Sequence, residues 1–460
     1  MMNKSVYIDT LGCAKNEYDS QVLAKYLTSK GCLITDDPTD SDILIINTCG
    51  FIEAAKIESI NRIMEMVNIK GEKKRLIITG CLSERYHDEL IKEIPEVDLI
   101  AGVNEYDRLS EIIKSIDLDS DDKFDNKDIV GGEAANTLEY TKRELPLGTY
   151  SAVLKVAEGC DNTCAFCAIP SIRGRYRSKK IEDVVREAED LSQKGIKELI
   201  LIAQDLSVYG KDIYGKIELV KLLKELCKVD GIRWIRLMYM YDNNITEELI
   251  KTIKEEPKIC NYIDIPIQHI SDNVLNSMRR KSSASSIKST INMIRSIIPE
   301  MCIRTTLMVG FPGETEEDFS ELLEFIREYK LDRIGVFSYS DEDGTIAYNM
   351  DGKLDEETKK NRVDILMTNQ LEISLQKNIE KIGKTFEVII DEVDGGSIAS
   401  SLESGVPDFT YIGRTRFDAP EVDCEVTIKS SKEHNTGEII PVIIEEALEY
   451  DLIGSEVEEL

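Results

Sequence analysis

The sequence predicts an α/β protein of three domains: an N-terminal βα (Rossmann-like) domain, a central partial (β/α)6 barrel and a small C-terminal antiparallel β-barrel. Three observations support this fold class. The chain has 460 residues, 42% hydrophobic and 31% charged, which is typical of a soluble globular protein with about three cores. Strand-like and helix-like runs alternate over the first ~115 residues and again from 150 to 381. Short alternating strands with glycine turns follow Gly383.

The N-terminal domain is expected over residues 3–117. Four strand-like runs in it are each followed by a helical pattern, and such a βα repeat predicts a parallel sheet. Residues 118–147 are expected to form a linker, because the run DLDSDDKFDNK is acidic, polar and without periodicity. The expected strands are Val6–Asp9, Ile43–Asn47, Leu76–Thr79 and Val97–Ala101, and the expected helices are Glu17–Ser29, Ile52–Val67, Ser83–Ile94 and Tyr106–Ile116.

The central domain is expected over residues 148–378 and the C-terminal domain over residues 379–454. Six βα units predict an open barrel whose site lies at the carboxyl ends of its strands. The long pattern Leu354–Lys381 is expected to close this domain as one helix, and the runs FEVIIDEV, CEVTIKSS and EIIPVIIEEAL are expected to be strands of the last domain. The barrel strands are expected at Ala152–Val156, Glu198–Ile202, Trp234–Met240, Tyr262–Ile267, Ile303–Val309 and Arg333–Ser338, with helices at Ile181–Lys194, Glu218–Lys228, Glu247–Glu255, Ile287–Ile298 and Glu316–Tyr329.

The charge balance excludes a generic basic nucleic-acid binder. The chain has 57 basic and 87 acidic side chains, a formal net charge of −30. Such a surface repels phosphate and favours basic partners. No apolar run approaches the ~20 residues of a membrane span, and the N-terminus lacks the basic and apolar segments of a signal peptide. We therefore expect a cytoplasmic protein without a membrane partner.

Eleven cysteines, an odd number, are expected to be mostly reduced in that compartment. Cys160, Cys164 and Cys167 form C-x3-C-x2-C after the first barrel strand. A zinc ribbon needs a second cysteine pair, which we do not find. Three clustered thiolates without a fourth predict an iron–sulfur cluster with one open iron for an exogenous ligand.

A second set of three cysteines follows the first three strands of the N-terminal domain. Cys13, Cys49 and Cys81 are far apart in the sequence, but the carboxyl edge of a parallel sheet would bring them together. This placement predicts a second three-thiolate site. The alternative is that the three are buried structural thiols. The other cysteines have no ligand spacing and are interpreted as structural: Cys32, Cys227, Cys260, Cys302 and Cys424.

Several motifs resemble one known family over essentially the whole chain. The C-x3-C-x2-C loop, within EGCDNTCAFCAIPSIRGRYRS, resembles the radical S-adenosylmethionine (SAM) superfamily. The C-terminal barrel resembles a TRAM domain. The N-terminal domain resembles that of the methylthiotransferases, through GC-x-KN at Gly12–Asn16, NTCGF at Asn47–Phe51 and TGCL at Thr79–Leu82.

One branch of the methylthiotransferase family modifies an adenosine of tRNA, and another modifies an aspartate of small-subunit ribosomal protein S twelve. This chain is more similar to the ribosomal-protein branch. Ala14, where that branch usually has proline, and EYDSQ at Glu17–Gln21 depart from its pattern. The supporting motifs are LILIAQDLSVYG (Leu199–Gly210), RLMYMY (Arg236–Tyr241), DIPIQHISD (Asp264–Asp272), GVFSYSDEDGT (Gly335–Thr345) and DAPEVD (Asp418–Asp423).

The charge of the last domain also favours a protein substrate. Residues 377–460 contain seven basic and twenty acidic side chains, 7 − 20 = −13. An acidic domain attracts a basic ribosomal protein and repels tRNA, so tRNA is not the expected partner. Glu421, Asp423 and Glu425 are expected to contribute to this attraction. The alternative is that every surface of this acidic chain is simply solvated by carboxylates.

The resemblance implies a transferase with two [4Fe–4S] clusters and SAM. Cys160, Cys164 and Cys167 would hold the cluster that, with SAM, generates a radical. Cys13, Cys49 and Cys81 would hold a second cluster that carries the sulfur. The product would be a methylthio group on the aspartate β-carbon, and a reductant protein such as flavodoxin or ferredoxin would supply electrons. The alternative functions are the same reaction on a tRNA adenosine and a non-catalytic iron–sulfur redox sensor.

Five further residues are expected to contact SAM. Phe166 lies between two cluster ligands, although it could equally be a loop-filling aromatic. Gln204 and Asp205 end one barrel strand, and Gln268 and His269 end another. His269 has the alternative of a core histidine. A basic run is expected either to bind a carboxylate of SAM or substrate or to be a solvated loop: Arg173, Arg175, Arg177, Lys179 and Lys180.

Overall fold

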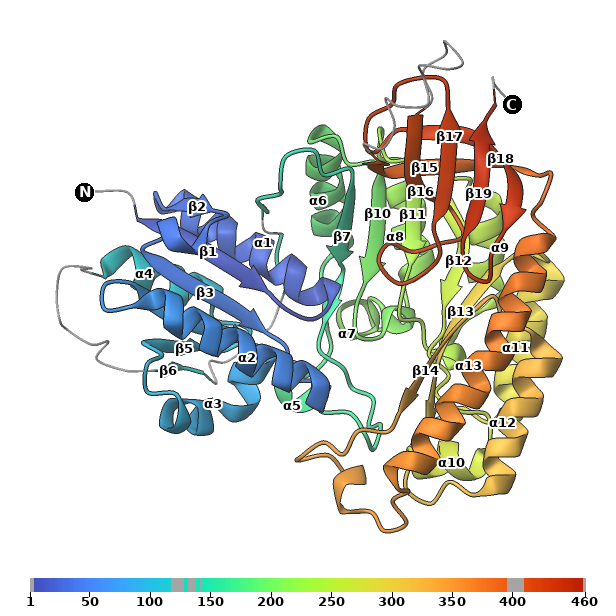
Figure 1. Ribbon diagram of the computed structural model, residues 1–460, viewed down its shortest axis with the longest axis horizontal. Helices are drawn as coiled ribbons and strands as arrows, with labels where there is room; N and C mark the ends of the chain where they lie inside the picture. Colours follow the sequence, from blue (N-terminus) through green and yellow to red (C-terminus); the bar gives the residue numbers. More distant parts are fainter. Residues whose placement is uncertain (1–3, 117–127, 131–137, 141, 395–408, 458–460) are drawn as a thin grey trace.

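The computed structural model describes residues 4–116, 128–130, 138–140, 142–394 and 409–457. Figure 1 shows the N-terminal domain beside the first strand of the central barrel and the C-terminal barrel above the amino ends of the central strands. No helix in the described ranges is long and apolar enough to cross a membrane.

The N-terminal domain is one parallel sheet with the strand order β2-β1-β3-β4-β5-β6 and helices on both faces. All six residues of the central β3 are buried, as expected for a strand covered on both sides. The four predicted strands and four predicted helices are confirmed. The elements are β1 (Ser5–Thr10), α1 (Ala14–Ser29), β2 (Leu33–Thr35), β3 (Ile43–Thr48), α2 (Glu53–Lys70), β4 (Arg75–Gly80), α3 (Cys81–Glu93), β5 (Leu99–Ala101), α4 (Tyr106–Ser115) and β6 (Asp128–Ile129).

Two edge strands, β2 and β6, were not expected. They have three and two residues, too few to show an alternating pattern. The strand β6 falls in the stretch expected to be a linker and pairs in parallel with β5. The acidic run DLDSDDKFDNK, at residues 117–127, lies outside the described residues.

The central domain is an open, all-parallel sheet with the order β14-β13-β12-β11-β10-β7. The six predicted strands and the helices between them are confirmed. The strands are β7 (Ser151–Lys155), β10 (Glu198–Ile202), β11 (Trp234–Leu237), β12 (Ile259–Asp264), β13 (Cys302–Val309) and β14 (Arg333–Ser338). The helices are α5 (Ile169–Arg173), α6 (Ile181–Gln193), α7 (Lys211–Tyr214), α8 (Leu219–Cys227), α9 (Glu247–Glu255), α10 (Asp272–Ser277), α11 (Ala284–Ile297), α12 (Glu316–Tyr329) and α13 (Glu356–Ile379), and a small ribbon pairs β8 (Ala157–Glu158) with β9 (Arg177–Ser178).

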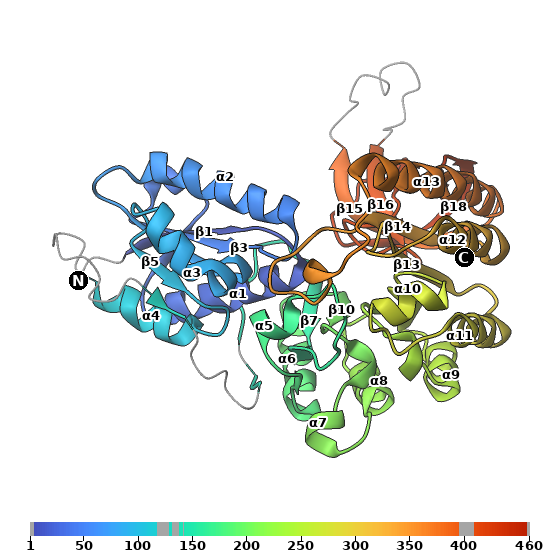
Figure 2. The ribbon, with the colours of Figure 1, turned by 90° about the horizontal axis from the view of Figure 1, so that it is seen from below.

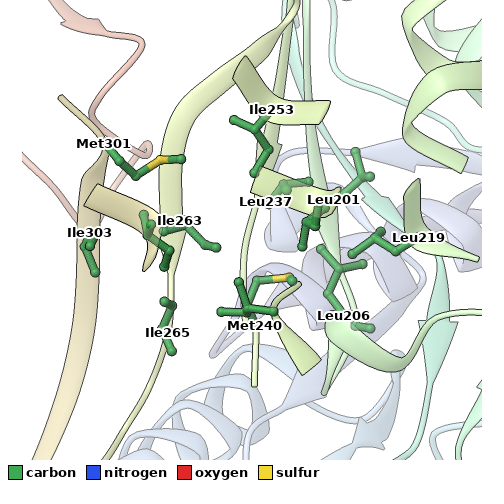
Figure 3. Packing of buried hydrophobic residues seen from close by; sticks show 14 of the residues in the cluster. Leu201, Leu206, Leu219, Leu237, Met240, Ile253, Ile263, Ile265, Met301 and Ile303 are labelled. Carbon is green, nitrogen blue, oxygen red and sulfur yellow. The ribbon is translucent and has the colours of Figure 1, made fainter. Parts of the chain in front are cut away.

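The two faces of this sheet have different roles. Alternate strand residues such as Leu201, Leu237 and Ile263 pack against helix residues such as Leu219 and Ile253 and form the main core (Figure 3). The intervening residues point into the barrel, as the period of two in a strand requires. At the amino ends of the strands, these inward residues contact the C-terminal domain.

The C-terminal domain is a closed five-stranded barrel with the order β15-β16-β17-β19-β18. Four seams are antiparallel, as expected, and the seam between β17 and β19 is parallel. A closed ring of five strands cannot alternate in direction all the way round, so one parallel seam is unavoidable. The strands are β15 (Thr385–Asp394), β16 (Phe409–Thr415), β17 (Val426–Ser430), β18 (Ile439–Ala447) and β19 (Leu452–Glu456).

Buried ion pairs dock this small barrel into the amino end of the central one. Glu198, at the start of β10, accepts hydrogen bonds from Arg236 of the central sheet and Arg414 of the small barrel. Burial disfavours the charged form of Glu198, but the attraction of the two guanidiniums is larger than this effect. The pKa of Glu198 is therefore lowered to about 2. Arg333, at the start of β14, donates to Asp418 over 2.7 Å.

The expectation that Asp423 attracts a basic partner is wrong. Its side chain is 1% exposed, accepts a hydrogen bond from the Tyr262 hydroxyl at 2.7 Å and pairs with Arg304 at 3.3 Å. Asp418 of the same DAPEVD segment is also buried. Buried charges must be paired, and both carboxylates pair with arginines of the central domain. They therefore hold the two domains together. Glu421 and Glu425 are exposed.

Replacing Asp418 with asparagine should destabilise the protein by about 3–5 kcal/mol, because it leaves the Arg333 guanidinium buried without its counter-charge. Urea denaturation measures this free energy of unfolding. The matched control is Glu247→Gln, which removes an exposed pair with Lys251 and should change stability little. Equal effects of the two substitutions would contradict the docking role.

Candidate functional site

The loops that carry Cys13, Cys49 and Cys81 meet at the carboxyl edge of the N-terminal sheet. Each cysteine follows one of three neighbouring strands, β1, β3 and β4. A Cβ added to Gly12 would lie 2.7 Å from Cys49 Cβ, and one added to Gly50 would lie 2.7 Å from Leu82 Cα. Only glycine permits these approaches. The packing of the three loops therefore gathers three thiols that are 32 or more positions apart in the sequence.

Asn16 and Arg173 fix the arrangement of these loops. The Asn16 amide donates to the carbonyls of Leu11 and Thr48, at 2.8 and 3.1 Å. Its carbonyl oxygen accepts from Arg173 at 2.7 Å, and the same guanidinium nitrogen donates to Cys81 Sγ at 3.5 Å. Arg173 comes from the central domain, so the first cysteine set is held partly by the second domain.

The loop that carries Cys160, Cys164 and Cys167 follows β7 at the carboxyl end of the barrel. Backbone N–H groups of Asn162 and Ile169 donate to the sulfurs of Cys160 and Cys167 over 3.4 and 3.5 Å. Amide donors of this kind stabilise a thiolate. The loop tip is pinned at Ala165, whose N–H donates to the carbonyl of Met278.

Four of the thiols, Cys49, Cys81, Cys160 and Cys167, are shifted toward the protonated form. Burial raises the pKa of Cys49 and of Cys160 to about 11 and that of Cys167 to about 12, with neighbouring cysteines adding to each shift. Burial also raises the pKa of Cys81, while Arg173 opposes the change. Binding a metal cluster would have to displace these protons.

The donor chemistry of both sets fits iron–sulfur clusters. Within the described residues, no group of three or more His, Cys, Asp or Glu side chains is placed to hold a single metal ion. A cubane takes one thiolate on each iron, so its ligands need not converge on one point. Three thiols without a histidine or carboxylate suit such a cluster.

A cavity of about 830 Å³ lies between the segment that follows Cys49 and the loop that carries Cys160, Cys164 and Cys167. Phe51, two residues after Cys49, lines one side, and Phe166, between Cys164 and Cys167, lines another. Gln268, Thr306 and Met308 line it from the carboxyl ends of the central strands. Cavities of this size hold cofactor-sized molecules. The remaining lining residues are Ile52, Glu53, Ala54, Phe337, Ser338, Tyr339, Ser340, Asp341, Glu342, Glu356 and Lys359.

Two of the five residues expected to contact SAM line this cavity. Phe166 packs edge-on against Phe311, with ring centroids 6.5 Å apart. Gln268 has a φ of +71° and is held through its backbone, which accepts from Met308 N–H and donates to the carbonyl of Thr306. A left-handed φ is unusual for glutamine, and in this backbone conformation Gln268 lines the cavity.

Gln204 and Asp205 support the cysteine loop instead. Gln204 donates to Glu158 at 2.7 Å, and its side-chain oxygen is buried without a hydrogen-bond partner among the described residues. Asp205 accepts from Asn162 at 2.8 Å. Neither residue lines the cavity.

His269 is fully buried and does not line the cavity. Its Nδ1 accepts the backbone N–H of Ser271 at 3.0 Å, just before α10. Burial lowers its pKa to about 4, so the ring is neutral at physiological pH. His269 is therefore a buried core histidine, as in the alternative given above.

The basic run is partly buried and partly exposed: Arg175 and Lys180 are exposed, as in the solvated-loop alternative, and no residue of the run lines the cavity. Arg173 and Lys179 are 2% exposed, and Lys179 pairs with Glu187 at 2.6 Å. Sequence reasoning missed the partners Asn16 and Asp19, although Asn16 lies in the GC-x-KN motif. It also missed Thr306 and Met308, which carry no signal beyond their place near a strand end.

Comparisons with known proteins cover all three domains. Three family models match: the uncharacterized protein family UPF0004 at residues 5–102, the radical SAM superfamily at 154–326 and the TRAM domain at 382–457. The chain is 48% identical over 454 residues to the ribosomal protein uS12 methylthiotransferase RimO of a Thermoanaerobacter species, covering 98% of this chain and 99% of the relative. It is 44% identical to the protein of the same name from Clostridioides difficile, with 99% of each chain covered.

Solved structures share the fold at low sequence identity. The radical SAM methyltransferase TsrM from Kitasatospora setae, with tryptophan and a SAM analogue bound, has a TM-score of 0.56 and 14% identity over 73% of each chain. The cobalamin-dependent SAM radical enzyme OxsB has a TM-score of 0.51 and 12% identity, covering 80% of this chain and 56% of OxsB. At these identities the likeness shows the fold alone.

In the cluster-free protein, iodoacetamide should alkylate Cys13 several-fold faster than Cys81 at pH 8. Cys13 is exposed, whereas Cys81 is buried and its pKa is raised. Peptide mass spectrometry over time measures both rates. Similar rates would mean that the loops around Cys81 open freely in the absence of a cluster.

Proposed function

Because this chain belongs to the RimO family of ribosomal protein uS12 methylthiotransferases, we propose that it transfers a methylthio group to the β-carbon of an aspartate in uS12, the ribosomal protein S twelve of the small subunit. The single observation that supports this most directly is a cavity lined both by Phe51, next to the cysteine set of the N-terminal domain, and by Phe166, within the cysteine loop of the radical SAM domain. A redox sensor needs neither this cavity nor a six-stranded barrel around it.

We propose that Cys160, Cys164 and Cys167 hold one [4Fe–4S] cluster, with SAM as the exogenous ligand, and that Cys13, Cys49 and Cys81 hold a second. When bound, these groups supply the radical and the sulfur needed to replace an unactivated C–H bond with C–S. The radical SAM match, the thiol-only donor sets and the backbone N–H donors at Cys160 and Cys167 support the assignment.

The chain's own residues would bind, orient and shield the reactants. Phe51, Phe166 and Met308 give the cavity apolar walls that exclude water from a reactive site. Gln268 and Thr306 add polar groups at the strand ends, where a bound cofactor can be oriented. The substrate aspartate would enter between the two cysteine loops.

We propose direct SAM contacts for Phe166 and Gln268, and supporting roles for the other three residues. Gln204 and Asp205 would act by holding Glu158 and Asn162 beside the cysteine loop. His269 would set the start of α10.

The proposed domain limits are 3–117 for the methylthiotransferase N-terminal domain, 118–147 for the linker, 148–378 for the radical SAM core and 379–454 for the TRAM domain. We further infer that the enzyme acts in the cytoplasm and receives electrons from a reductant protein such as flavodoxin or ferredoxin. The exposed Glu421 and Glu425 support a basic protein partner for the last domain.

With SAM, reductant and sulfide, the reconstituted enzyme should add a methylthio group to isolated uS12 and leave tRNA unmodified. Mass spectrometry of the two substrates, assayed in separate reactions, reads the outcome. Modification of tRNA with none of uS12 would transfer the proposal to the tRNA branch of the family.

Reconstitution should give about eight irons per chain, from two cubane clusters. The Cys160/Cys164/Cys167 triple alanine variant should hold about four irons and cleave no SAM. The Cys13/Cys49/Cys81 variant should also hold about four irons, cleave SAM and form no methylthio product. Product formation by the second variant at the normal yield would show that these thiols are only structural.

A further inference from the structure

Arg173 is a buried cation that reaches from one domain into the other. It ends α5, six positions after Cys167, and is 2% exposed. One guanidinium nitrogen donates to Asp19 of α1 at 2.7 Å and to Glu158 at 3.3 Å. The other donates to Asn16 at 2.7 Å and to Cys81 Sγ at 3.5 Å. The planar fork of arginine allows these two directions at once.

Through Asn16, Arg173 is connected to all three segments of the first cysteine set. Asn16 follows Cys13 by three positions, and its amide donates to the carbonyl of Thr48, which directly precedes Cys49. Arg173 itself contacts Cys81. The residue therefore links the first cysteine set to the helix that begins just after the second.

Arg173 donates to the sulfur of Cys81 in addition to forming ion pairs with nearby carboxylates. Two carboxylates, Asp19 and Glu158, face two cations, Arg173 and Lys155. This four-charge group is therefore balanced. The N–H groups aimed at Cys81 and Asn16 are additional to its ion pairs. The side chains of this group are buried, so salt screens the field of the guanidinium little.

We propose that Arg173 is a positioning residue that holds the Cys81 thiolate and raises the reduction potential of the cluster on Cys13, Cys49 and Cys81. Reduction adds negative charge to an iron–sulfur cluster, and a hydrogen bond from a cation to a ligand sulfur stabilises that added charge. This inference rests on the proposed function, because it needs a cluster at these cysteines.

The test isolates the first cluster in the Cys160/Cys164/Cys167 triple alanine background. Iron analysis after reconstitution comes first, followed by a redox titration monitored by electron paramagnetic resonance. Adding Arg173→Gln should retain the iron and lower the midpoint potential. Arg173→Lys keeps a charge for Asp19 and Glu158 but loses the fork, so its potential should lie between those of the parent and Arg173→Gln.

The matched control is Lys155→Gln. Lys155 contacts the same two carboxylates, and its described hydrogen bonds go to those carboxylates rather than to a sulfur. Its substitution should shift the potential less than Arg173→Gln does. If Arg173→Gln fails to fold, the comparison of Arg173→Lys with the parent and with Lys155→Gln carries the test.

Three results would overturn the inference. If about four irons are retained, an unchanged midpoint potential in the Arg173 variants would contradict the role of Arg173. An equally large shift in Lys155→Gln would contradict it as well. Neither result would affect the proposed function. Failure of the parent background to bind iron instead removes the cluster assignment, and the inference with it.

Discussion

The seam between the N-terminal sheet and the central barrel is held by buried charges, and the geometry of the candidate site depends on them. Asp19 on α1 receives Lys155 at 2.5 Å and Arg173 at 2.7 Å, both from the barrel. Breaking such a group is costly because each remaining charge would be buried without a partner. The pairs therefore fix one relative placement of the two domains, and the cavity has walls from both.

Parallel β topology explains why the cysteines could be predicted from the sequence. Strand ends are visible in the hydrophobic pattern, and the carboxyl ends of parallel strands share one edge. The positions of Cys13, Cys49 and Cys81 therefore implied that their loops meet. The spacing of Cys160, Cys164 and Cys167 is local and needed no fold at all.

Contacts between distant segments could not be predicted in this way. Arg173 and Asn16 are 157 positions apart, and no periodicity or spacing connects them. Asp423 looked like one acidic residue among many, but it pairs with Arg304 inside a domain interface. Gln268 and His269 are adjacent and occupy the same strand end, yet one lines the cavity and the other is buried, because a left-handed φ at Gln268 turns the chain.

The docked C-terminal barrel closes the amino end of the central barrel. Glu198 and Arg236 are fully buried beneath Arg414, so in the described part of the chain the amino end is filled by protein. Within the described residues, this end gives a small molecule no way to the cavity, which lies at the carboxyl ends of the strands. A protein substrate docked over the carboxyl ends of the strands, as proposed above, would therefore cover the side of the barrel on which the cavity lies.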